Sequence, residues 1–327
     1  MIKTEDIGVD IHKKIPIVHN PTKNVIVKMY DWTSNIHTDI PQSTLDVMHS
    51  GIPKIYVGLH KSLWETMGVP VVINKLGLDM PYIVIGKNLV KGISKPLIKA
   101  FGCIYVERAA KDRNKQNYQS ALEIKVKITK ALDKGYDVLI FPVDGRTKNG
   151  ETNSFFSTPF DAALDHLKNG PTKIIPFDVD YERLNDMPRM LKSIEKGKSY
   201  TFKIWHFLDW WKNLGNMYVN FGEPINIDEK TNRKKINRDT LKEAKNLVKI
   251  LPVNVFSEAV IRHRRNGGYF DYTIEEVIDD LRLFENKFRG FKNIDDISNN
   301  AGLTFSEPEK KYEIYSGYIK HYLPKQD

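Results

Sequence analysis

The sequence predicts an α/β fold, with a mainly parallel or mixed central sheet flanked by helices and a helical C-terminal portion. Between residues 55 and 177, short apolar runs alternate with longer stretches of helical pattern. This alternation is typical of a parallel sheet with helices on its faces. From about residue 228 the composition changes to charged helix. The chain has 327 residues, which is enough for one large α/β domain with a helical appendage.

The strands are predicted from short apolar runs that end at glycine, proline or charged residues. They cover 55–59, 81–86, 103–106, 137–141 and 173–177. One helix is predicted to begin just after His60. Three others are predicted over 91–100, 118–134 and 160–168. The 118–134 helix is the clearest, because its apolar residues share one face and Gly135 stands where a C-terminal cap belongs.

We expect three parts along the chain: a poorly resolved lead-in over 1–45, an α/β domain over 46–227, and a helical portion over 228–327 packed on that domain. Prolines in the lead-in are expected to break any long helix; they are Pro16, Pro21 and Pro41.

Two capping boxes are predicted in the C-terminal portion, one from Thr240 with Glu243 and one from Thr273 with Glu276. Pro252 is expected to separate two helical stretches. The later helix should bury one apolar face, formed by Ile274, Val277, Ile278 and Leu281.

The charge and cysteine content restrict the function classes. The formal net charge is +9, which suits anionic partners such as nucleic acid, lipid headgroups, phosphorylated metabolites or an acidic carrier protein. The single cysteine, Cys103, excludes an internal disulfide framework and a cysteine metal cluster. The N-terminus has no apolar signal-peptide core, and no run approaches the roughly 18 apolar residues of a membrane span. We therefore expect a cytoplasmic protein that meets membranes only at their surface.

His60 is the first candidate catalytic residue, because it ends a buried strand and Glu65 follows five residues later in the first turns of a helix. A carboxylate on one ring nitrogen would hold the tautomer and leave the other nitrogen free as a base. The alternative is a core histidine at a strand end beside a solvated glutamate.

Four strand ends together resemble the glycerolipid acyltransferase superfamily over roughly residues 55–225. The matching segments are His60 to Glu65, Gly102 to Arg108, Phe141 to Arg146, and Ile174 to Pro176. Two positions depart from the superfamily pattern. Glu65 stands where aspartate is usual, and Val143 replaces the glutamate of the third motif, with Asp144 one position on.

Within the superfamily, the chain looks most like glycerol-3-phosphate acyltransferase of the soluble plastid type. Residues 142–148 are similar to the Pro-Ser-Gly-Gly-Arg-Asp-Arg loop of that branch, and residues 77–89, 157–162 and 219–225 resemble three of its other blocks. The resemblance implies transfer of a fatty acyl group from acyl-CoA or acyl-acyl carrier protein to glycerol-3-phosphate, giving lysophosphatidic acid in phospholipid biosynthesis. It implies direct attack, with no metal and no cofactor beyond the acyl thioester co-substrate.

The resemblance also implies a role for each site residue. His60 would be the base and Glu65 would orient it. Arg108, Arg146 and Lys148 would bind the substrate phosphate, where arginine can bind in a forked geometry.

Asp144 and Gly145 would shape the same phosphate-binding loop, and Ser62 would flank the acceptor together with Lys61. Backbone N–H groups at the helix start would stabilise the tetrahedral oxyanion.

Two surface features suggest partners. Residues 91–115 hold seven basic and two acidic residues, which could attract acyl carrier protein, coenzyme A phosphates or an anionic membrane. A cluster that includes Trp205, Trp210 and Trp211 is either core packing or a membrane-interface patch.

Three other functions remain open. One is an acyltransferase that uses lysophosphatidic acid or dihydroxyacetone phosphate as acceptor. Another is a catalytically silent lipid-surface protein on this fold. A nucleic-acid-binding protein is the weakest, since no recognition-helix or aromatic RNA motif is present.

Overall fold

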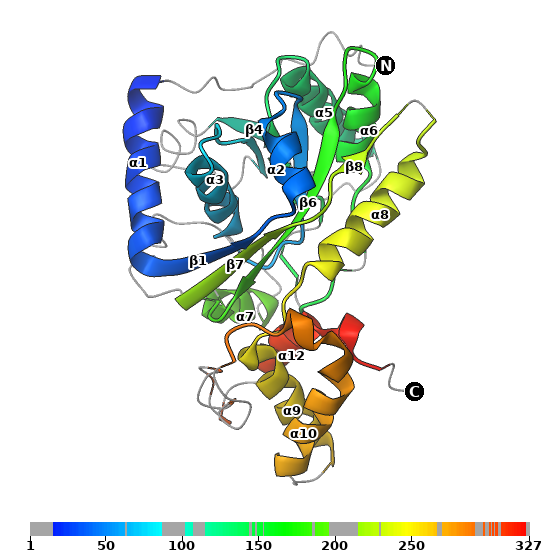
Figure 1. Cartoon of the computed structure of the whole chain (residues 1–327). Helices are drawn as coiled ribbons and strands as arrows, with labels where there is room; N and C mark the ends of the chain where they lie inside the picture. Colours follow the sequence, from blue (N-terminus) through cyan, green and yellow to red (C-terminus); the bar gives the residue numbers. More distant parts are fainter. Residues whose placement is uncertain are drawn as a thin grey trace.

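The computed structural model describes most of the chain, and Figure 1 draws it whole. The described residues are 16–62, 64–86, 102–106, 115–143, 146–147, 149–152, 154–184, 187–195, 215–228, 230–266, 270–291, 297, 301, 303, 305–306 and 309–324. The predicted helix at 91–100 and the three tryptophans at 205, 210 and 211 lie outside these residues.

The described strands form one eight-stranded sheet in the order β1-β7-β6-β2-β5-β3-β4, with β8 paired to β6. Their bounds are β1 Ser34–Asp39, β2 Lys54–Gly58, β3 Tyr82–Gly86, β4 Cys103–Val106, β5 Val138–Ile140, β6 Lys173–Tyr181, β7 Gly215–Phe221 and β8 Ile225–Asn226. β6 pairs antiparallel with β7 and β8, and the other pairs are parallel. The predicted mainly parallel or mixed sheet is confirmed.

Helices flank this sheet and gather at one end of it (Figure 1). The helices of the α/β part are α1 Pro16–Thr33, α2 Gln42–His49, α3 Glu65–Lys75, α5 Lys115–Leu132, α6 Thr158–His166 and α7 Met187–Glu195. The later ones are α8 Arg233–Asn246, α9 Pro252–Asn266, α10 Phe270–Leu281 and α12 Glu309–Gly317, with 3₁₀ turns η4 at Arg282–Lys287 and η6 at Lys320–Tyr322. α9, α10 and α12 lie below the sheet, next to α7.

The core is built from the apolar runs that predicted the strands. Every residue of β2 and β5 is buried, as is every residue of β6 after its first. This fits strands covered on both faces, which read as continuous apolar runs rather than alternating ones.

The prediction that prolines exclude a long helix from the first 45 residues is wrong. α1 is 18 residues long, begins at Pro16 and contains Pro21. A proline suits the first helical position, where its missing N–H has no helical partner. Further along α1, Tyr30 is fully buried and its hydroxyl donates to the Trp64 carbonyl at 2.6 Å. This packing offsets the backbone hydrogen bond that Pro21 removes.

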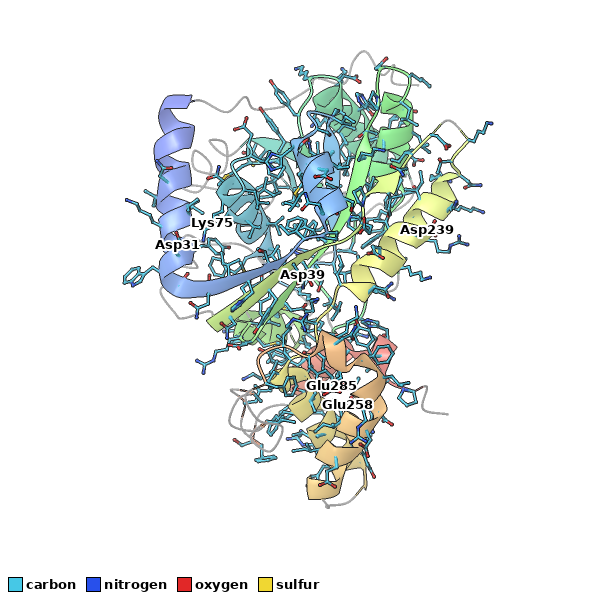
Figure 2. All side chains as sticks on the ribbon, viewed as in Figure 1. Asp31, Asp39, Lys75, Asp239, Glu258 and Glu285 are labelled. Carbon is cyan, nitrogen blue, oxygen red and sulfur yellow. The ribbon has the colours of Figure 1, made fainter. Side chains whose placement is uncertain are left out.

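The lead-in also supplies part of the sheet. β1 pairs parallel with β7 along its whole length. An ion pair between Lys75 and Asp31 joins α3 to α1, at the left of Figure 2. The sheet therefore extends into the segment that sequence left unassigned, and the division of the chain at residues 45 and 227 stays a prediction.

Both predicted capping boxes are wrong. α8 begins earlier than expected, with Asn232 as its N-cap, whose side chain accepts from the Lys234 N–H at 2.8 Å. Thr240 lies inside this helix and donates to the Ile236 carbonyl at 2.7 Å. Thr273 likewise lies inside α10. The capping pattern recurs by chance in charged helices, where threonine and glutamate often fall three residues apart.

Other expectations for the C-terminal portion are confirmed. α8 ends at Asn246 and α9 starts at Pro252, so the proline separates two helices. Val277 and Leu281 of α10 are fully buried.

Candidate active site

His60 follows β2, which lies between β5 and β6 in the sheet. β2 runs parallel to both neighbours, so the carboxyl ends of these three strands meet at one edge. The His60 ring stacks on Phe141, which follows β5, with 4.5 Å between ring centroids. The two strand ends that carry the predicted histidine and the predicted phosphate loop are therefore in contact.

Glu65 is the first residue of α3 and is completely buried. One of its carboxylate oxygens, Oε2, lies 3.0 Å from Nδ1 of His60. The glutamate thus reaches the imidazole despite its extra methylene group. The contact fits a tautomer with the proton on Nδ1 and the lone pair on Nε2, the arrangement of a general base.

Two backbone N–H groups hold the same carboxylate. The N–H of Lys61 donates to Oε1 at 2.9 Å and to Oε2 at 3.1 Å, and the N–H of Ser62 donates to Oε1 at 2.8 Å. The expectation that N–H groups near the helix start stabilise an oxyanion therefore does not hold for these two. They fix Glu65, and through it the orientation of His60.

Burial strengthens this carboxylate as a base. Burial raises the pKa of Glu65 well above its ordinary value, and the nearby Asp178 charge adds to the rise. The N–H groups of Ser62 and Lys61 and the Lys61 ammonium oppose it. The hydrogen bonds from Lys61, Ser62 and His60 all go to acceptor oxygens of this group and fit an ionised carboxylate, which stabilises the positive charge that forms on His60 when the ring accepts a proton.

A buried ion cluster lies behind the pair, and sequence reasoning missed it. The Lys61 ammonium lies 2.5 Å from Asp178 Oδ2 and 2.5 Å from Asp180 Oδ1, both on β6. All three side chains are buried. The signal in the sequence was a pair of acids, two residues apart, inside an otherwise apolar strand; buried charges need partners.

The charges in this cluster affect one another. Burial alone would lower the pKa of the Lys61 ammonium, but Asp178 and Asp180 overcome this and raise it. Burial raises the pKa of Asp178 to about 7, against the attraction of Lys61. The lysine therefore keeps its charge, and its side chain anchors the residue whose N–H holds Glu65.

The loop after β5 contacts the backbone of the histidine through Thr147, the residue that follows Arg146. The neighbouring Thr147 N–H donates to the His60 carbonyl at 3.0 Å, and the Thr147 hydroxyl donates to the Glu151 carbonyl at 2.8 Å. Arg146 is half-buried in this loop. Arg146, a basic residue of the predicted phosphate site, is thus next in sequence to Thr147, whose N–H is hydrogen-bonded to the His60 carbonyl.

The remaining predicted site residues divide into two groups. Ser62 is fully buried beside Glu65. Arg108, Asp144, Gly145 and Lys148 lie outside the described residues, so their roles stay predictions.

The described residues show neither a metal-binding cluster nor a membrane-spanning helix. They contain no group of three or more His, Cys, Asp and Glu side chains arranged to hold a metal ion. In the same part of the chain, every helix is too short or too polar to cross a bilayer.

Part of this chain fits a known family pattern, that of the acyltransferases. Residues 38–180 match the family model described as Acyltransferase. The match includes the strands from β2 to β6 and the segments that hold His60, Glu65 and Arg146. The resemblance to acyltransferases is thereby confirmed, whereas the substrate stays a prediction.

Similar proteins are named glycerol-3-phosphate acyltransferase. The protein of that name from Glaesserella parasuis is 22% identical over 261 residues, covering 71% of this chain and 32% of the relative. The one from Pseudoalteromonas atlantica is 26% identical over 208 residues, covering 61% of this chain and 24% of the relative. The chain thus spans about a third or less of the length of these relatives.

A solved structure with a similar arrangement is the 1-acyl-sn-glycerophosphate acyltransferase from Thermotoga maritima. It is 14% identical, covers 70% of this chain and 80% of its own, and superposes with a TM-score of 0.41. A structural similarity with this TM-score and this sequence identity does not assign a substrate.

Proposed function

We propose that this acyltransferase-like chain moves a fatty acyl group from acyl-CoA or acyl-acyl carrier protein to a hydroxyl of glycerol-3-phosphate. The product would be lysophosphatidic acid, a precursor of phospholipids. The observation that carries the proposal is the His60–Glu65 pair, with 3.0 Å between Nδ1 and Oε2, at the carboxyl edge of a mainly parallel sheet. The names of the similar proteins support the choice of acceptor.

His60 acts as the general base. Nε2 accepts the proton of the acceptor hydroxyl as its oxygen attacks the thioester carbonyl carbon, and Glu65 stabilises the resulting imidazolium. The tetrahedral intermediate then collapses, the C–S bond breaks, and the thiolate takes the proton back from His60. The products are an ester and a thiol, with no acyl group on the enzyme. A base of this kind contributes roughly 10²–10⁴-fold in rate.

Arg146 binds the acceptor phosphate in this proposal. The Thr147 N–H bonded to the His60 carbonyl supports this role, because it fixes the loop against the base. Arg108, Lys148, Asp144 and Gly145 complete the site as the family resemblance implies.

The proposed partners are acyl carrier protein and an anionic membrane surface, which the net charge of +9 would attract. In this picture the protein works in the cytoplasm as a peripheral membrane protein.

The test is incubation of the purified chain with labelled glycerol-3-phosphate and each acyl donor in turn. We expect labelled lysophosphatidic acid with at least one donor. Parallel reactions contain lysophosphatidic acid or dihydroxyacetone phosphate as acceptor. Product from one of these alone would reassign the acceptor, and a folded protein without product from any acceptor would contradict the proposed function.

A further inference from the structure

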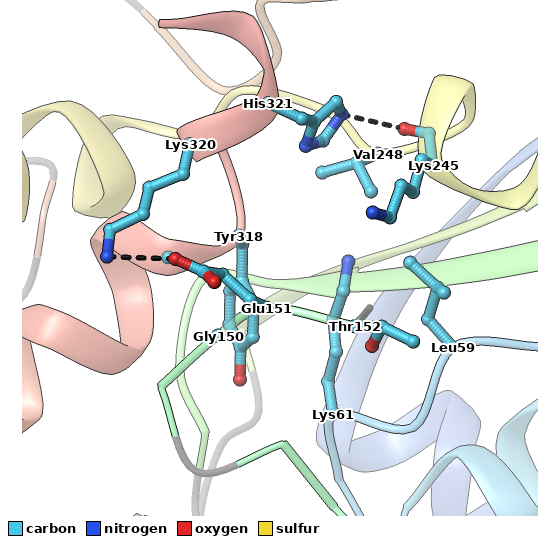
Figure 3. Close-up of a pocket in the computed structure, with 11 residues that line it drawn as sticks. Leu59, Lys61, Gly150, Glu151, Thr152, Lys245, Val248, Tyr318, Lys320 and His321 are labelled. Carbon is cyan, nitrogen blue, oxygen red and sulfur yellow. Dashed lines mark hydrogen bonds and ion pairs between the residues drawn. The ribbon is translucent and has the colours of Figure 1, made fainter. Parts of the chain in front are cut away.

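A cavity of about 260 Å³ lies between the α/β part and the C-terminal portion (Figure 3). Four separate stretches of chain line it. Leu59 and Lys61 come from the segment on either side of His60, residues 150–152 from the loop after Arg146, and the rest from α8 and the segment around η6. The cavity is therefore built from both halves of the molecule and borders the backbone that holds the base.

The rim of the cavity is fixed by a contact between two backbones. A Cβ atom placed on Gly317, at the end of α12, would lie 1.7 Å from the Asn149 carbonyl oxygen. A Cβ atom on Gly150 would lie 2.1 Å from the Ile314 carbonyl oxygen. Two glycines thus allow α12 to touch the loop directly, and the cavity beside them is a defined space rather than a loose gap.

One positive charge in the cavity is not neutralised by the described residues. Lys61 is paired with Asp178 and Asp180, and Lys320 is paired with Glu151 at 2.9 Å. Lys245 of α8 has no such partner for its ammonium in the described part of the chain. In Figure 3 the ammonium groups of Lys245 and Lys61 point toward one another. Because two carboxylates already neutralise Lys61, Lys245 is the cation that can attract an anion into the cavity.

His321 and Thr152 add hydrogen-bonding groups without adding charge. His321 Nε2 donates to the Lys245 carbonyl at 3.0 Å, so the neutral ring has its lone pair on Nδ1. Burial lowers the pKa of His321 to about 4, and the nearby Lys245 and Lys61 charges contribute to this, against the effect of the carbonyl bond. The Thr152 hydroxyl, which also lines the cavity, can donate or accept.

This set of groups matches a phosphate ester. An ammonium and a hydroxyl can donate to phosphate oxygens, and a neutral imidazole nitrogen can accept from the O–H of a monoanionic phosphate or from a neighbouring hydroxyl of the substrate. Leu59 and Val248 supply apolar lining beside them.

We propose that this cavity binds a phosphate group of one of the two substrates, with Lys245 as its cation and Thr152 and His321 as its hydrogen-bonding partners. The inference rests on the proposed acyl transfer. The phosphate has two possible sources, glycerol-3-phosphate or the phosphopantetheine-bearing donor. Arg146 itself does not line the cavity, although residues 150–152 of the loop that follows it do.

The kinetic test compares Lys245→Ala with Lys242→Ala, an exposed lysine one turn earlier on the same helix. Glycerol-3-phosphate and acyl-CoA are varied in turn. Lys245→Ala should raise the KM for one substrate about tenfold or more and leave the other unchanged, because one charged hydrogen-bonding partner is lost. The substrate affected identifies the source of the phosphate. Lys242→Ala should match the wild type. If neither KM changes in Lys245→Ala, the proposal is overturned.

A binding test separates this proposal from the proposed function. Inorganic phosphate is titrated calorimetrically into Arg146→Ala and into Arg146→Ala with Lys245→Ala, at constant ionic strength. Loss of phosphate binding in the second protein supports the cavity site even if no acyltransferase activity is found. Equal binding in both proteins overturns the cavity site. Lys245→Gln serves as a second variant if the alanine variant does not fold, since it removes the charge and keeps most of the aliphatic side chain.

Discussion

His60 and Glu65 are the residues on which the proposed chemistry depends. The sequence spacing predicted their pairing, and the structure brings Nδ1 and Oε2 within 3.0 Å. The sequence could not reveal what holds the pair in place. The N–H groups of Lys61 and Ser62 donate to Glu65. The Lys61 side chain is paired with acids of β6, the neighbouring strand in the sheet, which lie more than 100 positions further along the chain. Such a contact depends on the strand order, which short-range patterns do not encode.

Glu65→Gln should lower kcat by roughly tenfold or more, and by less than His60→Ala. The amide oxygen can still accept from the Lys61 and Ser62 N–H groups. The NH₂ group then faces Nδ1 and donates to it, which moves the ring proton to Nε2 and blocks the base. Glu65→Asp should retain activity, since aspartate is the usual acid of the superfamily. Steady-state kinetics of both variants is the measurement, and a wild-type kcat in Glu65→Gln would count against the assigned tautomer.

Arg146→Ala should raise the KM for glycerol-3-phosphate about tenfold or more, because losing one charged hydrogen-bonding partner costs on the order of 1.5–3 kcal/mol. A loosely held acceptor also presents its hydroxyl badly to His60, so kcat should fall as well. The KM for the acyl donor should stay near the wild-type value. Arg238→Ala, an exposed arginine on α8, is the matched control. A defect confined to the donor would show that Arg146 binds the donor instead.

At the scale of elements, apolar runs predicted β2 to β6, and the site follows from their parallel register. β1 was not predicted, because Ser34–Asp39 is a polar segment at the edge of the sheet and gains its strand conformation by pairing with β7. The start of α8 was misplaced because a charged helix contains several capping patterns. Buried strands are thus readable from local sequence, whereas edge strands and helix ends depend on tertiary contacts.

Gly58 at the end of β2 links strand packing to the orientation of His60. A Cβ atom there would lie 2.4 Å from the ring of Phe177, which is fully buried on β6. Phe177 contacts Phe141 edge to face at 5.6 Å between centroids, and Phe141 stacks on His60. The absence of a side chain at Gly58 therefore leaves space for the row of rings formed by Phe177, Phe141 and His60.

Gly58→Ala should destabilise the fold by about 1–3 kcal/mol, because the buried ring must move, and should also lower kcat per folded molecule. Gly170→Ala is the control, since the nearest atom to a Cβ atom there is 4.0 Å away. Denaturant unfolding and kinetics on both variants measure the two effects. If Gly58→Ala matches the control in both its unfolding free energy and its kcat, the row of rings does not position His60.

At the scale of the whole molecule, the C-terminal portion is part of the site's surroundings. The Lys61 ammonium lies 5.1 Å from the centre of the Tyr318 ring, and the Lys249 N–H donates to Asp180 at 2.8 Å. In Figure 1 the last helices lie at the end of the sheet where β6 leads into α7. The sequence predicted helices packed on the α/β part, but not their contact with the segment after His60.

The net charge of +9 belongs to the molecule as a whole and predicts weak, salt-sensitive binding to anionic membranes. Sedimentation with vesicles that contain anionic lipid should carry part of the protein down at low salt. Added salt should release it, and vesicles of neutral lipid alone should bind little. If the bound fraction changes with neither lipid charge nor salt, the attraction to the headgroups is not electrostatic.

Turnover of the folded His60→Ala protein with glycerol-3-phosphate and an acyl donor tests the central claim most directly. We expect a loss of roughly 10²–10⁴-fold in kcat, because the base acts in the chemical step. His166→Ala is the control, since His166 is also buried and lies 2.6 Å from a carboxylate, that of Asp133. The control should keep its kcat per folded molecule. A folded His60→Ala protein with wild-type turnover would contradict the assignment of His60 as the base.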